Sequence, residues 1–149
     1  MSTSSKKLSF RALSPKQSKS AKVFCFVARA GDVQKIAKIE RIGRSEKGVL
    51  SGFQRPQIEA HIREIKDYLS KDSAILPNSI IVGFTESAWL RPGNGFHNLT
   101  VDIQDGAPGW VVDGQQRFTA LGEIDKDFEV LVAGFICPSL EELQKQFIL

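Results

Sequence analysis

The sequence is poor in the residues that build metal sites and disulfide frameworks. It has two cysteines, Cys25 and Cys137, and two histidines, His61 and His97, which stand far apart among 149 positions. Zinc sites need cysteine and histidine in clusters at short spacing. We therefore expect neither a zinc site nor a haem. Both cysteines lie in apolar, strand-like stretches, which favours buried thiols in a reducing cytosol over a disulfide.

Long apolar runs are also missing. No run approaches the roughly 18 residues that a membrane-spanning helix needs, and the N-terminus carries charge without the apolar core of a secretory signal. We therefore expect a cytoplasmic protein with no membrane partner. With 149 residues, of which 42% are hydrophobic, the chain is long enough for one domain with a core of its own.

Acidic residues are absent from the first 22 positions. The six positive side chains of that segment are Lys6, Lys7, Arg11, Lys16, Lys19 and Lys22. The whole chain carries only +3, so residues 23–149 sum to −3. Attraction to nucleic acid would therefore come mainly from this segment, with Lys6, Lys7, Lys16 and Lys19 as candidate DNA contacts. The alternative is a solvated segment that only favours solubility, and we expect residues 1–7 to be a disordered basic tail.

Hydrophobic periodicity predicts a single α/β domain over residues 8–149, with a mixed sheet and flanking helices. The strand-like runs are 8–12, 22–29, 79–84, 99–103, 110–113 and 128–136, and the first two are expected to pair. The helical stripes are 32–42, 57–70, 115–124 and 139–149. Residues 89–98 hold proline, glycine and asparagine and are expected to form a loop. The run 128–136 is almost entirely apolar, which is typical of a central strand.

The last predicted helix begins with a capping box, Ser139 and Glu142, but has no stop signal. We expect the 149 residues to be a piece of a longer protein, with Phe147, Ile148 and Leu149 on exposed apolar surface or covering it. The alternative is a C-terminus docked in the core.

The strongest functional pattern is the polar run Asp113-Gly114-Gln115-Gln116-Arg117. It follows an apolar, β-branched stretch and precedes apolar residues at helical spacing, so it lies where a strand ends and a helix begins. Free backbone N–H groups and the positive end of a helix dipole make such a junction suitable for an anion such as phosphate. A second polar junction, Gln54-Arg55, precedes the helix at 57–70.

Residues 111–121, Val-Val-Asp-Gly-Gln-Gln-Arg-Phe-Thr-Ala-Leu, resemble the signature of the DGQHR-domain family, which is distantly similar to the ParB/sulfiredoxin fold. Gly-Phe-Gln-Arg-Pro at 52–56 and Leu-Pro-Asn-Ser-Ile-Ile-Val at 76–82 come in the family's order. One branch, DndB, regulates genes of DNA phosphorothioation. Another, DpdB, belongs to systems that place 7-deazaguanine bases in bacterial DNA. Gln116, where the family name has histidine, and the 52–56 element favour the DpdB branch.

That resemblance implies a nucleotide-binding, ATP-hydrolysing component of a bacterial DNA-modification and defence system. Its cofactors would be ATP and Mg²⁺, and its partners DNA and other subunits of the system. The implied catalytic residues are Asp113, which would hold Mg²⁺, Gln116 and Arg117. The implied nucleotide-binding residues are Gln54, Arg55, Gly114, Gln115 and Arg117. In a mostly parallel sheet both junctions gather at one end, so we expect Arg55, Asp113 and Arg117 to converge on one cleft.

Each of these side chains also has a structural alternative. Asp113 would cap the following helix, Arg117 would pair with a buried acid, Gln115 and Gln116 would be solvated residues of a helix start, and Arg55 would bond loop carbonyls. Outside the junctions, packing roles are favoured over base stacking for Trp89 and Trp110, and over base catalysis for His61.

The function that competes with the ATPase is a DndB-like, DNA-binding transcriptional regulator without catalysis. Its junction would grip DNA phosphate or only stabilise the fold. A nuclease is the weakest hypothesis, because the sequence has no cluster of acids for two metal ions.

Overall fold

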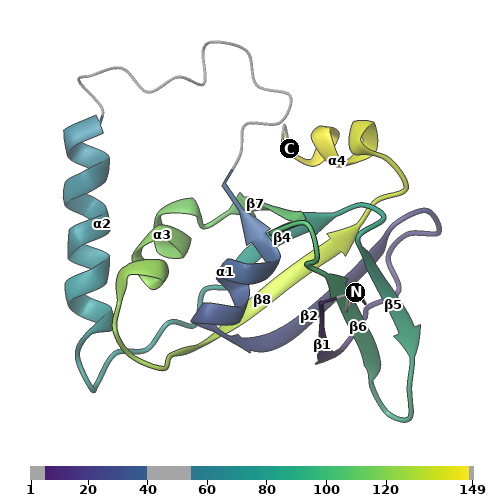
Figure 1. Cartoon of the computed structure of the whole chain (residues 1–149), viewed down its shortest axis with the longest axis horizontal. Coiled ribbons are helices and arrows are strands. Elements are labelled where there is room, and N and C mark those ends of the chain that lie inside the picture. Colours follow the sequence, from purple (N-terminus) through teal and green to yellow (C-terminus); the bar gives the residue numbers. More distant parts are fainter. Residues whose placement is uncertain (1–5, 40–54, 148–149) are drawn as a thin grey trace, which may run out of the picture.

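The computed structural model describes residues 6–39 and 55–147, except for the side chain of Arg55. In these residues the chain forms a three-stranded sheet, a five-stranded sheet and four helices (Figure 1). The strands are β1 (Lys7–Ala12), β2 (Lys22–Arg29), β3 (Ala37–Lys38), β4 (Ile80–Phe84), β5 (Ala88–Pro92), β6 (His97–Asp102), β7 (Gly109–Asp113) and β8 (Glu129–Ile136). The helices are α1 (Ala30–Ile36), α2 (Arg55–Leu69), α3 (Gln115–Glu123) and α4 (Leu140–Gln146). The predicted single α/β domain with a mixed sheet is confirmed.

The five-stranded sheet has the order β2-β8-β4-β7-β3. β8 pairs antiparallel with β2 and parallel with β4, while β7 pairs antiparallel with β4 and parallel with β3. The apolar run at 128–136 is thus an interior strand, as predicted. The expectation of a mostly parallel sheet is wrong, so parallel strands do not gather the two polar junctions at one end.

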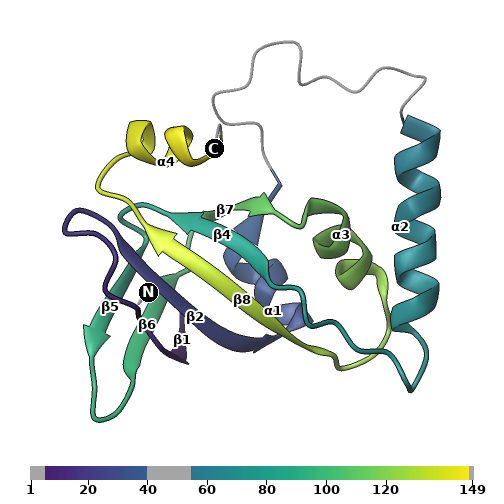
Figure 2. The same cartoon turned by 180° about the vertical axis from the view of Figure 1, so that it is seen from behind.

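One face of this sheet carries the core. Phe24, Phe26 and Ala28 of β2 point toward it and are buried, whereas Val27 between them is 54% exposed. Helices α1 and α3 cover the core face (Figures 1 and 2), and Val33 and Leu121 belong to the same buried cluster. Period-2 alternation in β2 therefore separates a covered face from an open one.

Alternation also corrects the prediction for Cys25, which is exposed on the open face between Phe24 and Phe26. Cys137 is buried, as predicted, and both thiols are free. Neighbouring apolar residues do not bury a side chain that points to the opposite face of the strand.

The three-stranded sheet has the order β1-β6-β5, with both pairs antiparallel. β1 therefore pairs with β6 rather than with β2. It packs against β2 through the rings of Phe10 and Phe26, whose centroids lie 4.6 Å apart, and the next residue, Leu13, forms an isolated bridge with Cys25. The loop predicted at 89–98 is wrong, because most of it forms the hairpin β5–β6. The glycines occupy its turn, where Gly95 has φ 84°. Pro92 ends β5, an edge strand, where a missing N–H costs no ladder bond.

Helix α1 is shorter than the predicted 32–42. It ends at Ile36, and Ala37 turns to an extended backbone that pairs with Gly109 of β7. This pairing outweighs the helical spacing of the apolar residues, and Ile42 lies outside the described residues. Helix α2 begins with Arg55-Pro56, a favourable first turn, and stands at one side of the molecule against α3 (Figure 1).

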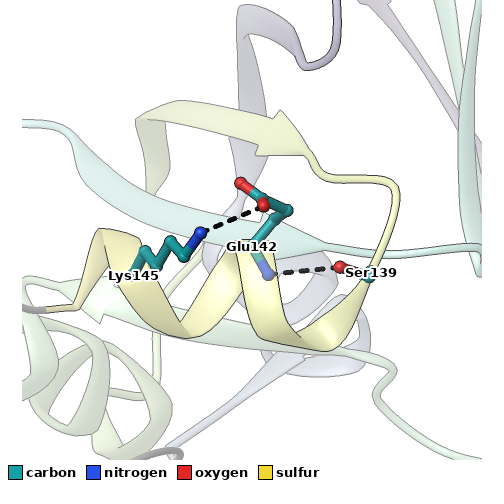
Figure 3. Close-up of polar contacts among 3 residues, drawn as sticks. All are labelled: Ser139, Glu142 and Lys145. Atoms are coloured by element: carbon teal, nitrogen blue, oxygen red, sulfur yellow. Dashed lines mark hydrogen bonds and ion pairs between the residues drawn. The ribbon is translucent and has the colours of Figure 1, made fainter.

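Of the capping box predicted for α4, the Ser139 N-cap is confirmed, whereas the Glu142 side chain contacts Lys145 instead of the N-cap backbone. The backbone N–H of Glu142 donates to Oγ of Ser139 at 3.2 Å, and Nζ of Lys145 contacts the Glu142 carboxylate at 3.2 Å (Figure 3). Leu143 is fully buried and Phe147 is half-buried against the same small cluster, so Phe147 covers apolar surface, as expected. Ile148 and Leu149 lie outside the described residues. Across the described helices, none is long and apolar enough to cross a membrane.

Candidate functional site

The strand–helix junction predicted at 113–117 is confirmed. β7 ends at Asp113, Gly114 has φ 88°, and α3 begins at Gln115. That left-handed conformation favours glycine, and a Cβ at Gly114 would lie only 3.0 Å from Nη2 of Arg117. Gly114 occupies the N-cap position and no side chain caps the helix, so the capping role considered for Asp113 is wrong. Asp113 is exposed at the end of its strand.

Gln115 points back along β7 rather than into solvent. Its side-chain Nε2 donates to the carbonyl oxygen of Val112 at 3.0 Å, and its own carbonyl accepts from Oγ1 of Thr119 at 3.0 Å. The amide thereby satisfies a carbonyl at the end of the strand, which is a structural role. Gln116, next to it, is half-buried.

Arg117 faces helix α2. Its Nη2 donates to the carbonyl oxygen of Ser79 at 3.2 Å, and its Nε is buried without a hydrogen-bond partner in the described part of the chain. The hollow that it lines has a volume of about 300 Å³ and includes His61, Glu64 and Tyr68 of α2. No acid of the described residues pairs with Arg117, which disagrees with the buried ion pair considered for it. His61 is exposed, with Nδ1 3.6 Å from the Glu64 carboxylate, so the packing role expected for it is wrong.

Asp113 lines a different hollow, of about 830 Å³, between the open sheet face and α4. Cys137, Glu142 and Phe147 share that hollow with it. Desolvation raises the pKa of the Cys137 thiol, and the negative charge of Glu142 raises it further. Asp113 and Arg117 therefore line two different hollows.

Helix α2 begins at the second junction and also lines the hollow of Arg117, so it relates the two junctions in space. His61, which lines the hollow of Arg117, follows Arg55 by six residues, or about 9 Å along the helix axis. Gln54 and the side chain of Arg55 lie outside the described residues. A nucleotide site with ATP and Mg²⁺ at the two junctions stays a prediction. Within residues 6–39 and 56–147, no three Cys, His, Asp or Glu side chains lie close enough together to hold a metal ion.

The basic N-terminal segment is folded from Lys7 onward. Lys7 and Arg11 are exposed on β1, and the following loop, residues 13–21, returns the chain to Lys22 at the start of β2. Lys16, Lys19 and Lys22 line a shallow hollow of about 500 Å³ together with His97 of β6. We call residues 13–22 the basic loop.

Short-range bonds hold the basic loop in place. Leu13 and Cys25 exchange two backbone hydrogen bonds of 3.0 and 2.9 Å, and Oγ of Ser14 donates to the carbonyl of Val23. Within the loop, Oγ of Ser18 accepts from the backbone N–H of Ala21 at 3.2 Å. The lysines therefore project from a loop that is anchored at its ends, and the alternative that they only favour solubility stays open.

The outer face of the three-stranded sheet is polar and positively charged at one end, a feature that the sequence did not single out. Arg11, Asn98 and Arg91 are paired across its three strands and are all exposed. Trp89 shares this face and is half-buried, with Nζ of Lys7 5.6 Å from its ring centroid. The apolar run Ala-Trp-Leu at 88–90, with its aromatic residue, is the signal that would have favoured a strand.

Comparison with known proteins identifies one family. The model of the DndB family, described as DNA-sulfur modification-associated, matches residues 10–149. No curated protein and no solved structure matches the chain significantly.

Proposed function

Because this chain belongs to the DndB, DNA-sulfur modification-associated family, we propose that it is a DNA-binding regulator of a DNA phosphorothioation system. It acts without catalysis of its own, and other components of the system are its protein partners. This is the function that the sequence offers as the alternative to an ATPase. ATP hydrolysis and a role in 7-deazaguanine insertion stay predictions.

The observation that carries the proposal is the anchored basic loop. Lys16, Lys19 and Lys22 stand within seven residues, and no acid occurs between positions 1 and 22. All three line one shallow hollow beside the start of β6. Lysines that contact DNA phosphates release condensed counterions, which supplies most of the affinity for any duplex. An anchored loop also loses less conformational entropy on binding than a free tail.

The junction at 113–117 supports the same proposal through its bonding. Gln115 and Arg117, two of the side chains proposed to hold a nucleotide, donate hydrogen bonds to backbone carbonyls of their own chain. They thereby join α3 to β7 and to the residue that precedes β4. These contacts favour the interpretation that the junction stabilises the fold over the interpretation that it binds a nucleotide.

The test is the salt dependence of binding to a mixed-sequence duplex of about 30 base pairs. We expect log K to fall steeply with log salt. The triple variant Lys16→Gln, Lys19→Gln, Lys22→Gln should reduce that slope by about one for each phosphate that the protein no longer neutralises. The control variant Lys35→Gln, Arg63→Gln, Lys71→Gln removes the same charge from exposed positions elsewhere. Equal reductions in both variants, or no binding by the unaltered protein, would refute the proposal.

A further inference from the structure

We propose that the three-stranded sheet reads base pairs in the major groove of duplex DNA through the row Arg11, Asn98 and Arg91. The inference rests on the proposed function and assigns sequence discrimination to one surface. We call these three residues the reading row. The basic loop would then supply affinity that is independent of sequence.

The strand register places the row on one face. Arg11 of β1 pairs with Asn98 of β6, which pairs with Arg91 of β5. Residues directly opposite one another in antiparallel strands point to the same side. Leu99 and Val101, which alternate with Asn98 and Thr100 along β6, are fully buried, so they face the core. The reading row therefore faces solvent.

The chemistry of the row suits base edges. Arginine donates two hydrogen bonds to O6 and N7 of guanine, and asparagine forms a bidentate pair with adenine. Among the residues that the structure describes, none forms a hydrogen bond or ion pair with the side chains of Arg11, Asn98 or Arg91. Their donors are therefore available to a ligand.

Arg11 is also held in place. Its guanidinium carbon lies 4.8 Å from the ring centroid of Phe96, in the turn between β5 and β6. Stacking on an aromatic ring occupies the face of the guanidinium and leaves its N–H edge free. A positioned arginine loses less side-chain entropy when it binds than a mobile one.

The dimensions of the row match the groove. Neighbouring strands lie about 4.8 Å apart, so three strands place the outer arginines about 10 Å from each other. Base pairs rise about 3.4 Å each along the axis. A row of this length laid along the major groove would therefore address about three successive base pairs. Strands enter DNA grooves in this manner in several regulators.

Charge orients the duplex on the sheet. The basic loop approaches His97, which precedes Asn98 in β6 and points to the opposite face, so the loop lies at the same end of the sheet as the reading row. Three acids, Glu86, Asp102 and Asp105, instead line a hollow at the opposite end of the sheet. Asp102 pairs with Lys7, four positions along β1 from Arg11. Lys38 lines that hollow as well, so the positive charges of Lys7 and Lys38 partly offset the three acids. A polyanion is therefore attracted more strongly to the end of the sheet that carries the reading row and the basic loop than to the end where the acids gather.

The experiment selects duplexes from a library with a randomised segment of about 20 base pairs, using the unaltered protein. The ratio of affinities for the enriched duplex and a scrambled duplex is then measured for Arg91→Ala, Asn98→Ala and the control Arg63→Ala. We expect each reading-row variant to lower the ratio about tenfold or more and the control to leave it unchanged. The variant Arg91→Lys keeps the charge but not the fork, so it should lower the ratio while keeping the salt slope.

The outcomes separate this inference from the proposed function. No binding to any duplex by the unaltered protein would refute both. Binding without enrichment of a sequence motif, or an unchanged ratio in the reading-row variants, would refute the inference alone. The basic-loop triple variant should weaken binding to the enriched and the scrambled duplex equally. A greater loss of affinity for the enriched duplex would assign sequence discrimination to the basic loop instead.

Discussion

Arg117 and Ser79 connect two parts of the fold that lie 38 positions apart in the chain, through a 3.2 Å hydrogen bond from Nη2 to the backbone carbonyl. Arg117 stands in the first turn of α3, and Ser79 immediately precedes β4. Arg117, the last residue of the polar run 113–117, therefore joins α3 to the segment that enters β4 of the five-stranded sheet. The buried Nε of Arg117, which has no partner among the described residues, is a desolvation cost that the folded state bears at this position.

Replacing Arg117 by alanine should lower the free energy of unfolding by about 1.5–3 kcal/mol, because the variant has no charged donor for the carbonyl. Arg117→Lys should recover part of this, since it keeps a charged donor without the planar fork. Urea unfolding followed by circular dichroism measures both. If Arg117 instead serves a nucleotide, alanine would leave stability unchanged and lower the affinity for ATP with Mg²⁺.

Gly134 should resist substitution because a ring lies against it. A Cβ there would come within 2.6 Å of Phe24 in the core. We expect Gly134→Ala to cost about 1–3 kcal/mol of stability, the usual range for overpacking. Gly31→Ala is the matched control in α1, where a Cβ would meet nothing within 4 Å. It should be neutral or stabilise by up to about 1 kcal/mol, and equal destabilisation at both glycines would contradict the described packing.

The two thiols should differ in reactivity. Cys25 is exposed, whereas Cys137 is buried and has a raised pKa. Iodoacetamide should label Cys25 first, and labelling of Cys137 in a Cys25→Ser variant should be slow and increase with pH. Glu142→Gln should speed it, because one cause of the raised pKa is removed. Mass spectrometry of the labelled peptides would contradict this if Cys137 reacted at the rate of Cys25.

The same raised pKa affects stability in alkali. Below the ordinary thiol pKa, both the folded and the unfolded chain hold the proton. Above it the unfolded chain loses the proton first, so the free energy of unfolding decreases as the pH rises toward the folded pKa. This decrease belongs to Cys137 and should persist in the Cys25→Ser variant, as urea unfolding across that pH range would measure.

Much of the fold could be predicted because its signals are local. The strand–helix junction at Gly114 and the N-cap at Ser139 each depend on residues a few positions apart. The short α1 and the pairing of β1 with β6 could not be predicted, since both depend on strands far away in sequence. Long-range pairing outweighs local propensity at such positions.

The candidate site shows the same limit. The sequence indicated the positive charge of residues 6–22, but an expected loop at 89–98 hid the strands that carry Asn98 and Arg91. Only the register of β1, β6 and β5 reveals that these residues share a row with Arg11. The type and spacing of Arg117 predict an anion ligand, which stays a prediction, and the hydrogen bond to Ser79 is a structural contact that the spacing could not indicate.

Lysine footprinting tests the central claim most directly. The protein is acetylated briefly with an amine-reactive reagent, with and without a mixed-sequence duplex of about 30 base pairs, and each lysine is quantified by mass spectrometry. We predict that DNA protects Lys16, Lys19 and Lys22 in the basic loop, and that high salt removes the protection. Lys35, Lys71 and Lys145 should react equally in both samples. Protection of these three instead, or bound DNA that leaves the basic loop fully reactive, would contradict the account.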